Sequence, residues 1–275
     1  MSHISNLDTA PPLSGVRVVS IAQNVPGPLA VARLVERGAR AIKVEPTSGD
    51  PFAAMCRSWY DAMHAGVTVQ RLDLKGEGRA RLTTLLDDAD LFISSQRPSA
   101  LARLGLAPED LLRAHPTLRQ LRIVGSSGDP EEAGHDLTYQ AHAGLLRDAL
   151  PMALIADVMA SERAISEALL LLRAAPGTVV EVGMFESLAP LTASIRHTLT
   201  SPGALLGGGA PRYGVYVTKA GRIAVAALEP HFERRLYERL GLPSGADPSS
   251  NFLERTAEEW ESWAREHDIP IVALR

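Results

Sequence analysis

Residues 15–22, Gly-Val-Arg-Val-Val-Ser-Ile-Ala, begin the pattern from which the architecture follows. This β-branched run predicts a buried strand. The turn Asn-Val-Pro-Gly-Pro at residues 24–28 comes next, and residues 29–37 have the period of a helix that ends at Gly38. Residues 41–45, Ala-Ile-Lys-Val-Glu, predict a second strand. Because the connection between the two strands is a helical crossover, the strands should be parallel.

The same alternation continues to residue 184. Further strands are predicted at residues 67–72, 89–94, 118–124 and 178–184, and helices at residues 76–87, 108–114 and 156–173. Strands and helices that alternate in this way predict an α/β fold of the Rossmann-like type, with a doubly wound parallel sheet. Ligands of such sheets bind beyond the carboxyl ends of the strands, where the loops at residues 94–98 and 125–136 should lie.

The character of the sequence changes after residue 200. Two short alternating runs, residues 213–218 and 222–227, are joined by Lys219-Ala-Gly221 and predict a hairpin. Helices are predicted at residues 230–240 and 256–266. We therefore expect a large Rossmann-like domain over residues 1–200 and a smaller C-terminal α+β domain over residues 201–275.

Composition argues against several classes of protein. The 275 residues carry a net charge of -4, so no basic field is available to attract nucleic acid or an anionic membrane. No apolar run approaches the roughly 20 residues that span a bilayer, and the first residues do not resemble a signal peptide. Cys56 is the single cysteine, which excludes an internal disulfide, and no Cys/His spacing predicts a metal site. We expect a cytoplasmic protein that binds no metal, nucleic acid or membrane.

The residues best suited to chemistry lie in Gly134-His-Asp-Leu-Thr-Tyr139 and in the apolar stretch that leads to Asp157. A histidine beside an acid, joined by a second carboxylate from another element, can remove and return a proton when the environments separate their pKa values. Structural alternatives remain open. Asp136 and Asp157 are also suited to cap helices, and Glu229, just before a predicted helix, is suited to serve a helix terminus.

Several stretches together resemble the α-methylacyl-CoA racemase branch of the family III CoA transferases, the CaiB/BaiF family. The main stretches are Gly134-His-Asp-Leu-Thr-Tyr-Gln-Ala-His-Ala-Gly144, Leu206-Gly-Gly-Gly-Ala-Pro-Arg-Tyr213 and Ala227-Leu-Glu-Pro-His-Phe232, with Gly38-Ala-Arg-Ala-Ile-Lys-Val-Glu45 and Leu72-Asp-Leu-Lys75 before them. The resemblance covers nearly the whole chain from about residue 13. It implies a Rossmann-like large domain, a smaller domain, and a dimer of two interlinked chains with the active site between domains.

The resemblance also implies a role for each candidate residue. In the racemase branch the histidine of Gly-His-Asp and a later aspartate are the two catalytic bases, which fall on His135 and Asp157. The glutamate of the Glu-Pro motif supports the histidine and falls on Glu229, while Asp136 belongs to the Gly-His-Asp motif itself. The implied activity is racemisation or epimerisation of a 2-methylacyl-CoA. In the transferase branch the aspartate instead attacks the thioester and forms an acyl anhydride.

In either branch coenzyme A is part of the substrate, and no permanently bound cofactor is expected. Regions that hold CoA in the family fall on Leu72, Asp73, Leu74, Lys75, Arg97, Gly134, Leu137, Thr138 and Tyr139. Lys75 and Arg97 are suited to phosphate. A solvated surface cation is the alternative interpretation of each.

Three stretches depart from the family pattern. Pro46 follows Glu45 where an arginine is usual, residues 64–71 lack a basic Gly-Lys-Arg-Ser segment, and Val158-Met-Ala-Ser-Glu-Arg-Ala replaces a glycine-rich loop. Side chains in that loop leave backbone amides less room to approach a thioester oxygen. These departures favour a third hypothesis, a non-catalytic subunit. The expected assembly is a homodimer, or a heterodimer with a homologue.

Overall fold

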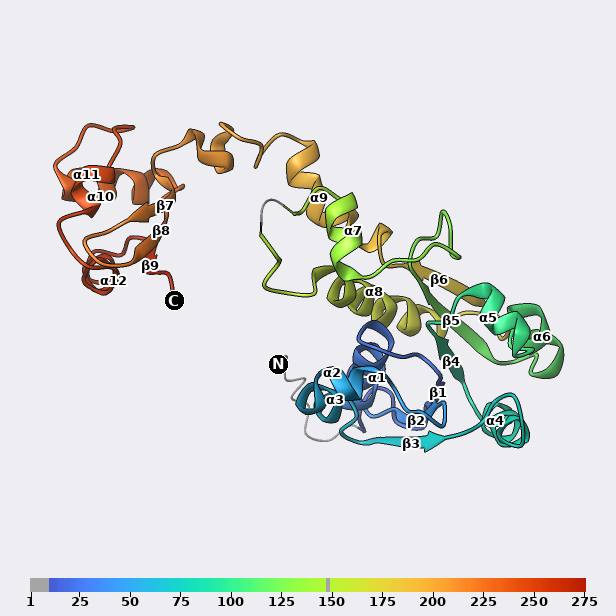
Figure 1. Ribbon diagram of the computed structural model, residues 1–275. Helices are drawn as coiled ribbons and strands as arrows, with labels where there is room; N and C mark the ends of the chain where they lie inside the picture. The colour runs from blue at the N-terminus through green and yellow to red at the C-terminus, as the bar shows by residue number, and fades with distance from the viewer. Residues whose placement is uncertain (1–9, 147–148) are drawn as a thin grey trace. The chain divides into compact units, whose positions relative to one another are not determined.

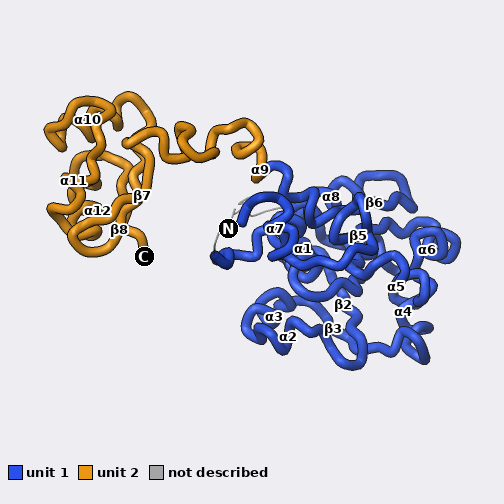
Figure 2. The backbone as a smooth tube through the Cα atoms, turned by 45° about the horizontal axis from the view of Figure 1, so that its top comes forward, with its two compact units in different colours: residues 1–190 blue, residues 191–275 orange. Residues whose placement is uncertain are grey.

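The computed structural model describes residues 10–146 and 149–275, and the chain divides into two compact units. One unit ends at Pro190, and the other extends from Leu191 to Arg275 (Figure 2). The sequence predicted a boundary between residues 200 and 201, ten residues further along the chain. We describe each unit by itself.

The larger unit alternates strands and helices along most of its length. Its elements are β1 (Arg17–Ser20), α1 (Pro26–Glu36), β2 (Arg40–Glu45), α2 (Phe52–Met55), α3 (Arg57–Met63), β3 (Val67–Arg71), α4 (Gly78–Asp87), β4 (Leu91–Ser94), α5 (Pro98–Arg103), α6 (Pro108–Ala114), β5 (Arg119–Val124), α7 (Asp136–His142), α8 (Ile155–Leu171), β6 (Val179–Gly183) and the short helix Glu186–Leu188. None of the helices in the described part of the chain is long and apolar enough to cross a bilayer.

The six strands form one parallel sheet in the order β3-β2-β1-β4-β5-β6 (Figure 1). Chain order runs outward from β1 to β3 on one side and from β4 to β6 on the other, which is the order of a doubly wound sheet. The predicted Rossmann-like α/β fold is therefore confirmed. The strand order reverses between β1 and β4, and this switch point is where such sheets bind ligands.

Alternate residues of the strands enter two hydrophobic cores, one on each face of the sheet. Val18 and Ile93 pack with α1 and α8 on one face. Val19 and Phe92 pack with α4, α5 and α6 on the other. Because both faces are covered, a central strand can be buried along its whole length, as β4 illustrates with four buried residues in succession.

The smaller unit contains a three-stranded antiparallel sheet in the order β7-β8-β9. α9 (Ala189–Arg196) spans the boundary between the units. The other elements of the smaller unit are a short turn at Leu205–Gly209, β7 (Tyr213–Val217), β8 (Arg222–Ala226), α10 (Pro230–Leu240), α11 (Ser249–Phe252), α12 (Ala257–Glu266) and β9 (Ile271–Ala273). The hairpin of β7 and β8 and the two long helices agree with the sequence prediction. The third strand was not predicted, because a run of three residues carries too little periodicity.

Gly27 in the first turn of α1 provides a test of the packing beside the switch point. A Cβ atom at this position would overlap the Cβ atom of Ala22, which is wholly buried. We expect Gly27→Ala to lower the free energy of unfolding by about 1–3 kcal/mol, because neither backbone segment can move away freely. Thermal denaturation measures the change. The control Arg33→Ala removes only exposed contacts of the same helix, and an equal loss in both variants would contradict the packing argument.

Candidate active site

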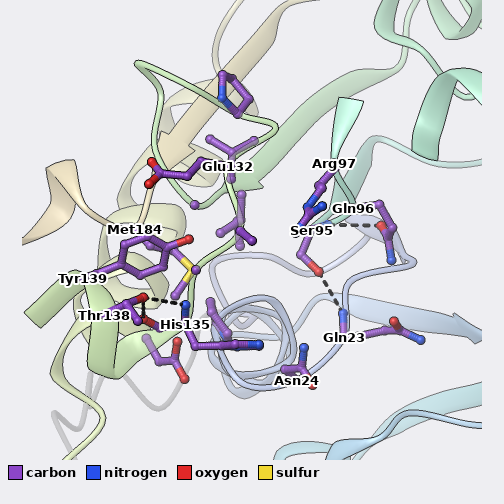
Figure 3. A pocket seen from close by; sticks show the side chains of 18 residues that line it. Gln23, Asn24, Ser95, Gln96, Arg97, Glu132, His135, Thr138, Tyr139 and Met184 are labelled. Carbon is purple, nitrogen blue, oxygen red and sulfur yellow. Dashed lines mark hydrogen bonds between the residues drawn. The ribbon is translucent and has the colours of Figure 1, made fainter. Parts of the chain in front are cut away.

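A cavity of about 410 Å3 lies beyond the carboxyl ends of β1, β4 and β5 (Figure 3). Gln23 and Asn24 line it from the loop after β1, and Ser95, Gln96 and Arg97 line it from the loop after β4. The loop after β5, the start of α7, the first turn of α8 and Met184 also line it. The cavity therefore lies at the switch point, where the sequence predicted that a ligand would bind.

His135 lines the cavity from the residue that precedes α7. Its backbone is held by Thr138, whose hydroxyl accepts a hydrogen bond from the His135 N–H at 3.0 Å and donates one to the His135 carbonyl at 2.8 Å. The imidazole itself is exposed. The backbone of His135 is thus fixed by its own helix turn, while its ring is free to meet a ligand.

Tyr139 forms part of the wall behind His135. Its side chain is buried and its hydroxyl group lies against Gly134 and Gly125, so that a Cβ atom on either glycine would overlap it. Both positions therefore require glycine for space. Burial and then the negative charge of Glu132 raise the pKa of the Tyr139 hydroxyl. The group stays protonated at neutral pH and can donate a hydrogen bond into the cavity.

Asp136 is buried and its carboxylate joins two helices. One oxygen accepts from the N–H of Ala156 at 2.7 Å and from the N–H of Asp157 at 3.2 Å, while the other accepts from the Gln140 amide at 2.6 Å. Asp136 therefore caps α8, which begins nineteen residues later, rather than α7, in which it lies. Because these hydrogen bonds occupy both oxygens, the geometry favours a positioning role over the catalytic role expected from the sequence.

Asp157 lies in the first turn of α8 and lines the same cavity as His135. Burial, and to a smaller extent the negative charge of Asp136, raise the pKa of Asp157 to about 7. A carboxyl group with this pKa is populated in both protonation states near neutral pH, which suits it to proton transfer. The alternative that Asp157 caps its own helix is not supported, since it lies inside the helix and the cap is Asp136.

The residues predicted to bind CoA fall into two groups. Arg97, Gly134, Thr138 and Tyr139 line the cavity. Leu137 is exposed and does not line it. Leu72, Asp73, Leu74 and Lys75 follow β3 and lie outside the cavity wall. Leu72 and Leu74 pack against a hydrophobic core, and Asp73 accepts a hydrogen bond from the Lys75 N–H, so this segment has a structural explanation of its own.

Glu229 lies in the smaller unit, at the residue before α10. Its side chain is exposed and makes no capping hydrogen bond to that helix. The alternative that Glu229 serves the terminus of α10 is therefore not supported by a hydrogen bond. Its predicted support of His135 stays a prediction.

Several cavity residues were missed in the sequence. Asn24, Gln96, Glu132 and Met184 line the wall, although no motif identified them. The carboxyl ends of β1 and β4 were the available signal, since neighbouring strands at a reversal of strand order share one crevice. Within residues 10–146 and 149–275, no group of three or more His, Cys, Asp or Glu side chains is arranged to hold a metal ion.

A further residue that the sequence did not single out, Glu186, shapes the loop that carries Glu132. Glu186 accepts hydrogen bonds from the Ser126 hydroxyl at 2.8 Å and from the Ser127 N–H at 3.1 Å. Partial burial opposes the charge of this carboxylate, but these hydrogen bonds outweigh burial and lower its pKa. At the far end of the loop, Glu131 accepts from Ser99 in the first turn of α5. The loop after β5 is therefore fastened at both ends.

Comparison with protein families and curated proteins identifies relatives of the whole chain. The model of CoA-transferase family III matches residues 13–275. An alpha-methylacyl-CoA racemase of Homo sapiens is 29% identical over 290 residues, which cover 90% of this chain and 74% of that protein. The racemase of Mus musculus is 32% identical, and the match covers 86% of this chain and 67% of that protein. A succinate–glutarate CoA-transferase of Agrobacterium fabrum is 29% identical, and the match covers 86% of this chain and 68% of that protein.

Solved structures show the same fold. A crystal structure of a hypothetical protein from Mycobacterium tuberculosis has a TM-score of 0.83 at 24% identity and covers 97% of this chain and 84% of that one. A CaiB/BaiF family protein from Brucella suis has a TM-score of 0.78 at 20% identity, with 96% and 84% covered. Both similarities extend over the larger and the smaller unit.

Proposed function

Because the chain belongs to CoA-transferase family III, we propose that it is an acyl-CoA racemase or epimerase that moves the α-proton of a 2-methylacyl-CoA. The observation that carries the proposal is the pairing of His135 with Asp157 in one cavity, with the pKa of Asp157 raised to about 7. Two different proton carriers in one crevice can serve the two faces of a carbon centre.

The proposed reaction is a proton transfer through an enolate. The thioester carbonyl acidifies the α-C–H bond, and neutral His135 takes the proton from one face while the electron pair moves onto the carbonyl oxygen. Protonated Asp157 then donates its proton to the opposite face of the same carbon, which inverts the configuration. In the reverse direction Asp157 is the base and His135 the acid. A pKa near the working pH makes both directions accessible to Asp157.

Other cavity residues would bind the substrate. The Arg97 guanidinium is suited to a phosphate or diphosphate group of CoA, and Thr138 keeps the His135 backbone in place. We propose further that Glu229 supports the histidine, that CoA enters only as part of the substrate, and that the chain assembles as a dimer, all of which rest on the family pattern. The proposed cytoplasmic location rests instead on the composition, with its single cysteine.

Exchange of the α-proton with deuterium tests the function. We expect the wild type to exchange both the (R)- and the (S)-form of a 2-methylacyl-CoA in deuterium oxide, followed by NMR. His135→Ala should lose racemisation but keep exchange of the one enantiomer whose α-proton faces Asp157. This asymmetry arises because only one base is removed.

The control for this experiment is Glu162→Gln on the exposed side of α8, which should exchange both enantiomers at the wild-type rate. If the wild type exchanges neither enantiomer across a panel of acyl-CoA thioesters, the racemase proposal is wrong. Equal loss of exchange from both enantiomers in His135→Ala would contradict the two-base assignment.

A CoA-transferase activity is the second candidate, favoured by the similarity to CoA-transferases such as the Agrobacterium fabrum enzyme. In that reaction the Asp157 carboxylate attacks the thioester carbonyl, the CoA thiolate leaves, and a mixed anhydride forms on the enzyme. Hydroxylamine intercepts such an anhydride and leaves a hydroxamate at Asp157, detectable by mass spectrometry, whereas a racemase gives no adduct. Absence of both exchange and adduct would favour the non-catalytic subunit.

A further inference from the structure

A buried cluster of charged side chains lies at the end of β2 and takes no part in the proposed proton transfer. Lys43 Nζ is 2.5 Å from an Asp50 carboxylate oxygen and 3.2 Å from Glu45 Oε1, and the three side chains are at most 2% exposed. The Tyr60 hydroxyl donates to Glu45 at 2.7 Å. Arg71 Nε lies 3.8 Å from the second Glu45 oxygen, so two cations balance two carboxylates.

His64 completes the cluster without adding charge. Its Nε2 lies 3.0 Å from Lys43 Nζ and its Nδ1 lies 2.6 Å from the Tyr60 carbonyl oxygen. Burial, together with the Lys43 charge, lowers the pKa of His64, so the ring is neutral and accepts from Lys43. Because removal of one partner from a buried ion pair is strongly unfavourable, the cluster fixes each of its members in one arrangement.

The cluster extends to the cavity through Asp50. The Asn24 N–H donates to both Asp50 carboxylate oxygens, each at 3.2 Å, and the Phe52 N–H donates to one of them at 3.0 Å. Asn24 has a φ of 64°, in the left-handed region that side chains disfavour and asparagine tolerates best. A wholly buried, charge-paired carboxylate thus holds an unfavourable backbone conformation at the cavity wall.

The Asn24 side chain is the part of this arrangement that borders the cavity. It is exposed, it lines the cavity, and its carboxamide has no hydrogen-bond partner among the described residues. Figure 3 shows the His135 ring and the Asn24 side chain extending from different walls toward the same part of the cavity. Asn24, His135 and Asp157 line this one cavity, so a thioester bound there has the Asn24 amide as a neighbouring polar group.

We propose that Asn24 is a substrate-contacting residue whose amide donates a hydrogen bond to the thioester carbonyl oxygen, and that Lys43 and Asp50 are positioning residues that hold it there. The proposal rests on the proposed function, since it needs an acyl-CoA in the cavity. The donor would strengthen its hydrogen bond as the oxygen gains negative charge in the enolate, which stabilises the transition state more than the bound substrate.

Binding of two matched ligands tests the proposal. Isobutyryl-CoA carries the thioester carbonyl, and S-isobutyl-CoA is the thioether that lacks it. We expect Asn24→Gly to weaken the affinity for isobutyryl-CoA about tenfold, the effect of one lost hydrogen bond, and to leave the affinity for S-isobutyl-CoA unchanged, both by calorimetry. Glycine is the sharp substitution, because it keeps the left-handed backbone without strain and removes only the amide.

The positioning role is tested by a double-mutant cycle. Asp50→Asn alone should reproduce the selective loss for the thioester, and Asp50→Asn combined with Asn24→Gly should lose no more than Asn24→Gly alone, because Asp50 acts through Asn24. A merely structural role of Asp50 would instead weaken both ligands and add to the loss from Asn24→Gly. If Asp50→Asn does not fold, Lys43→Arg, which keeps the positive charge, replaces it in the cycle and should show the same selective, non-additive loss.

The outcomes separate this inference from the proposed function. If the wild type binds both ligands and Asn24→Gly leaves the ratio of their affinities unchanged, the inference alone is overturned. If that ratio depends on Asn24 and the wild type exchanges no α-proton, the racemase proposal fails and the carbonyl contact stands. If the wild type binds neither ligand, both are overturned.

Discussion

The Asp157→Asn variant should racemise a 2-methylacyl-CoA about 100- to 10,000-fold more slowly than the wild type, while His135 still exchanges the α-proton of the enantiomer that faces it. Asparagine has nearly the shape of aspartate but neither accepts nor releases a proton at neutral pH. The hydrogen bond from the residue 157 N–H to Asp136 belongs to the backbone and is kept. The loss should therefore fall on kcat, while the KM for the thioester changes little. Rates measured by NMR over a range of substrate concentrations separate the two constants.

The same variant also changes how stability depends on pH. The pKa of Asp157 in the folded protein, about 7, lies above its ordinary value of 3.8, so the folded state binds a proton more tightly than the unfolded state. The stability that this proton contributes is complete below pH 3.8 and is lost as the pH rises through about 7. The Asp157→Asn variant has no titrating carboxyl group at this position and therefore lacks this pH-dependent contribution to stability. The difference in melting temperature between variant and wild type should therefore move in favour of the variant from pH 5 to pH 8.

Glu162→Gln is the matched control for both measurements, because Glu162 lies on the same helix and its carboxylate pairs with Arg33 at the surface, at 3.8 Å. It should keep the wild-type kcat and the wild-type dependence of stability on pH. Wild-type kcat in Asp157→Asn would exclude Asp157 as a proton carrier. A hydroxamate at Asp157 in the hydroxylamine experiment would reassign it as a nucleophile.

Local patterns predicted most of the larger unit, because the information for each element lies within the element. The β-branched run of β1 and the helical period of α1 are each read from fewer than about twelve neighbouring residues, although α1 begins at Pro26, within the stretch predicted as a turn. Because strands and helices alternate repeatedly along the chain, few arrangements other than a parallel sheet are possible. Short elements such as β9 carry no comparable signal.

The contacts that build the cavity depend on residues far apart in the sequence. Asp136 caps a helix whose first bonded N–H, that of Ala156, is 20 residues away, and Asp50 holds Asn24 across 26 residues. A single sequence does not show which of its many carboxylates faces a particular helix terminus. It did show which side of the sheet the site occupies, because the carboxyl ends of parallel strands share an edge. His135 and Asp157 were singled out by residue type and by the family resemblance, whereas Asn24, at the same edge, matched no motif.

Replacement of Asp136 by asparagine should lower the pKa of Asp157 and move the pH profile of the reaction. The N-terminus of a helix favours a negative charge in its first turn, and Asp136 already places one at the terminus of α8. Its repulsion is the second cause, after burial, of the raised pKa of Asp157. Asp136→Asn removes the repulsion and keeps one oxygen to cap the helix. In the direction in which Asp157 donates the proton, the basic limb of kcat against pH should therefore shift to lower pH.

In the opposite direction Asp157 acts as the base, and the acidic limb of kcat should shift to lower pH by the same amount, because one group titrates in both. At pH 7 the variant should consequently lose rate in one direction and gain it in the other. Racemisation of (R)- and (S)-substrates followed separately over pH 5–9 measures the two limbs. A uniform loss of kcat at every pH, in both directions, would mean that Asp136 only maintains the structure of the site.

Asp136→Ala distinguishes the charge of Asp136 from its hydrogen bonds. Alanine leaves the buried N–H of Ala156 without a partner and removes the cap of α8, so the free energy of unfolding should fall by about 2–4 kcal/mol. Asp136→Asn should lose less, because its side-chain oxygen still caps the helix, although its amide group would face the Gln140 amide that now donates to Asp136. Both substitutions remove the charge, so both should shift the pH limbs equally. A shift in Asp136→Ala alone would show that the position of α8, and not the charge of Asp136, sets the pKa of Asp157.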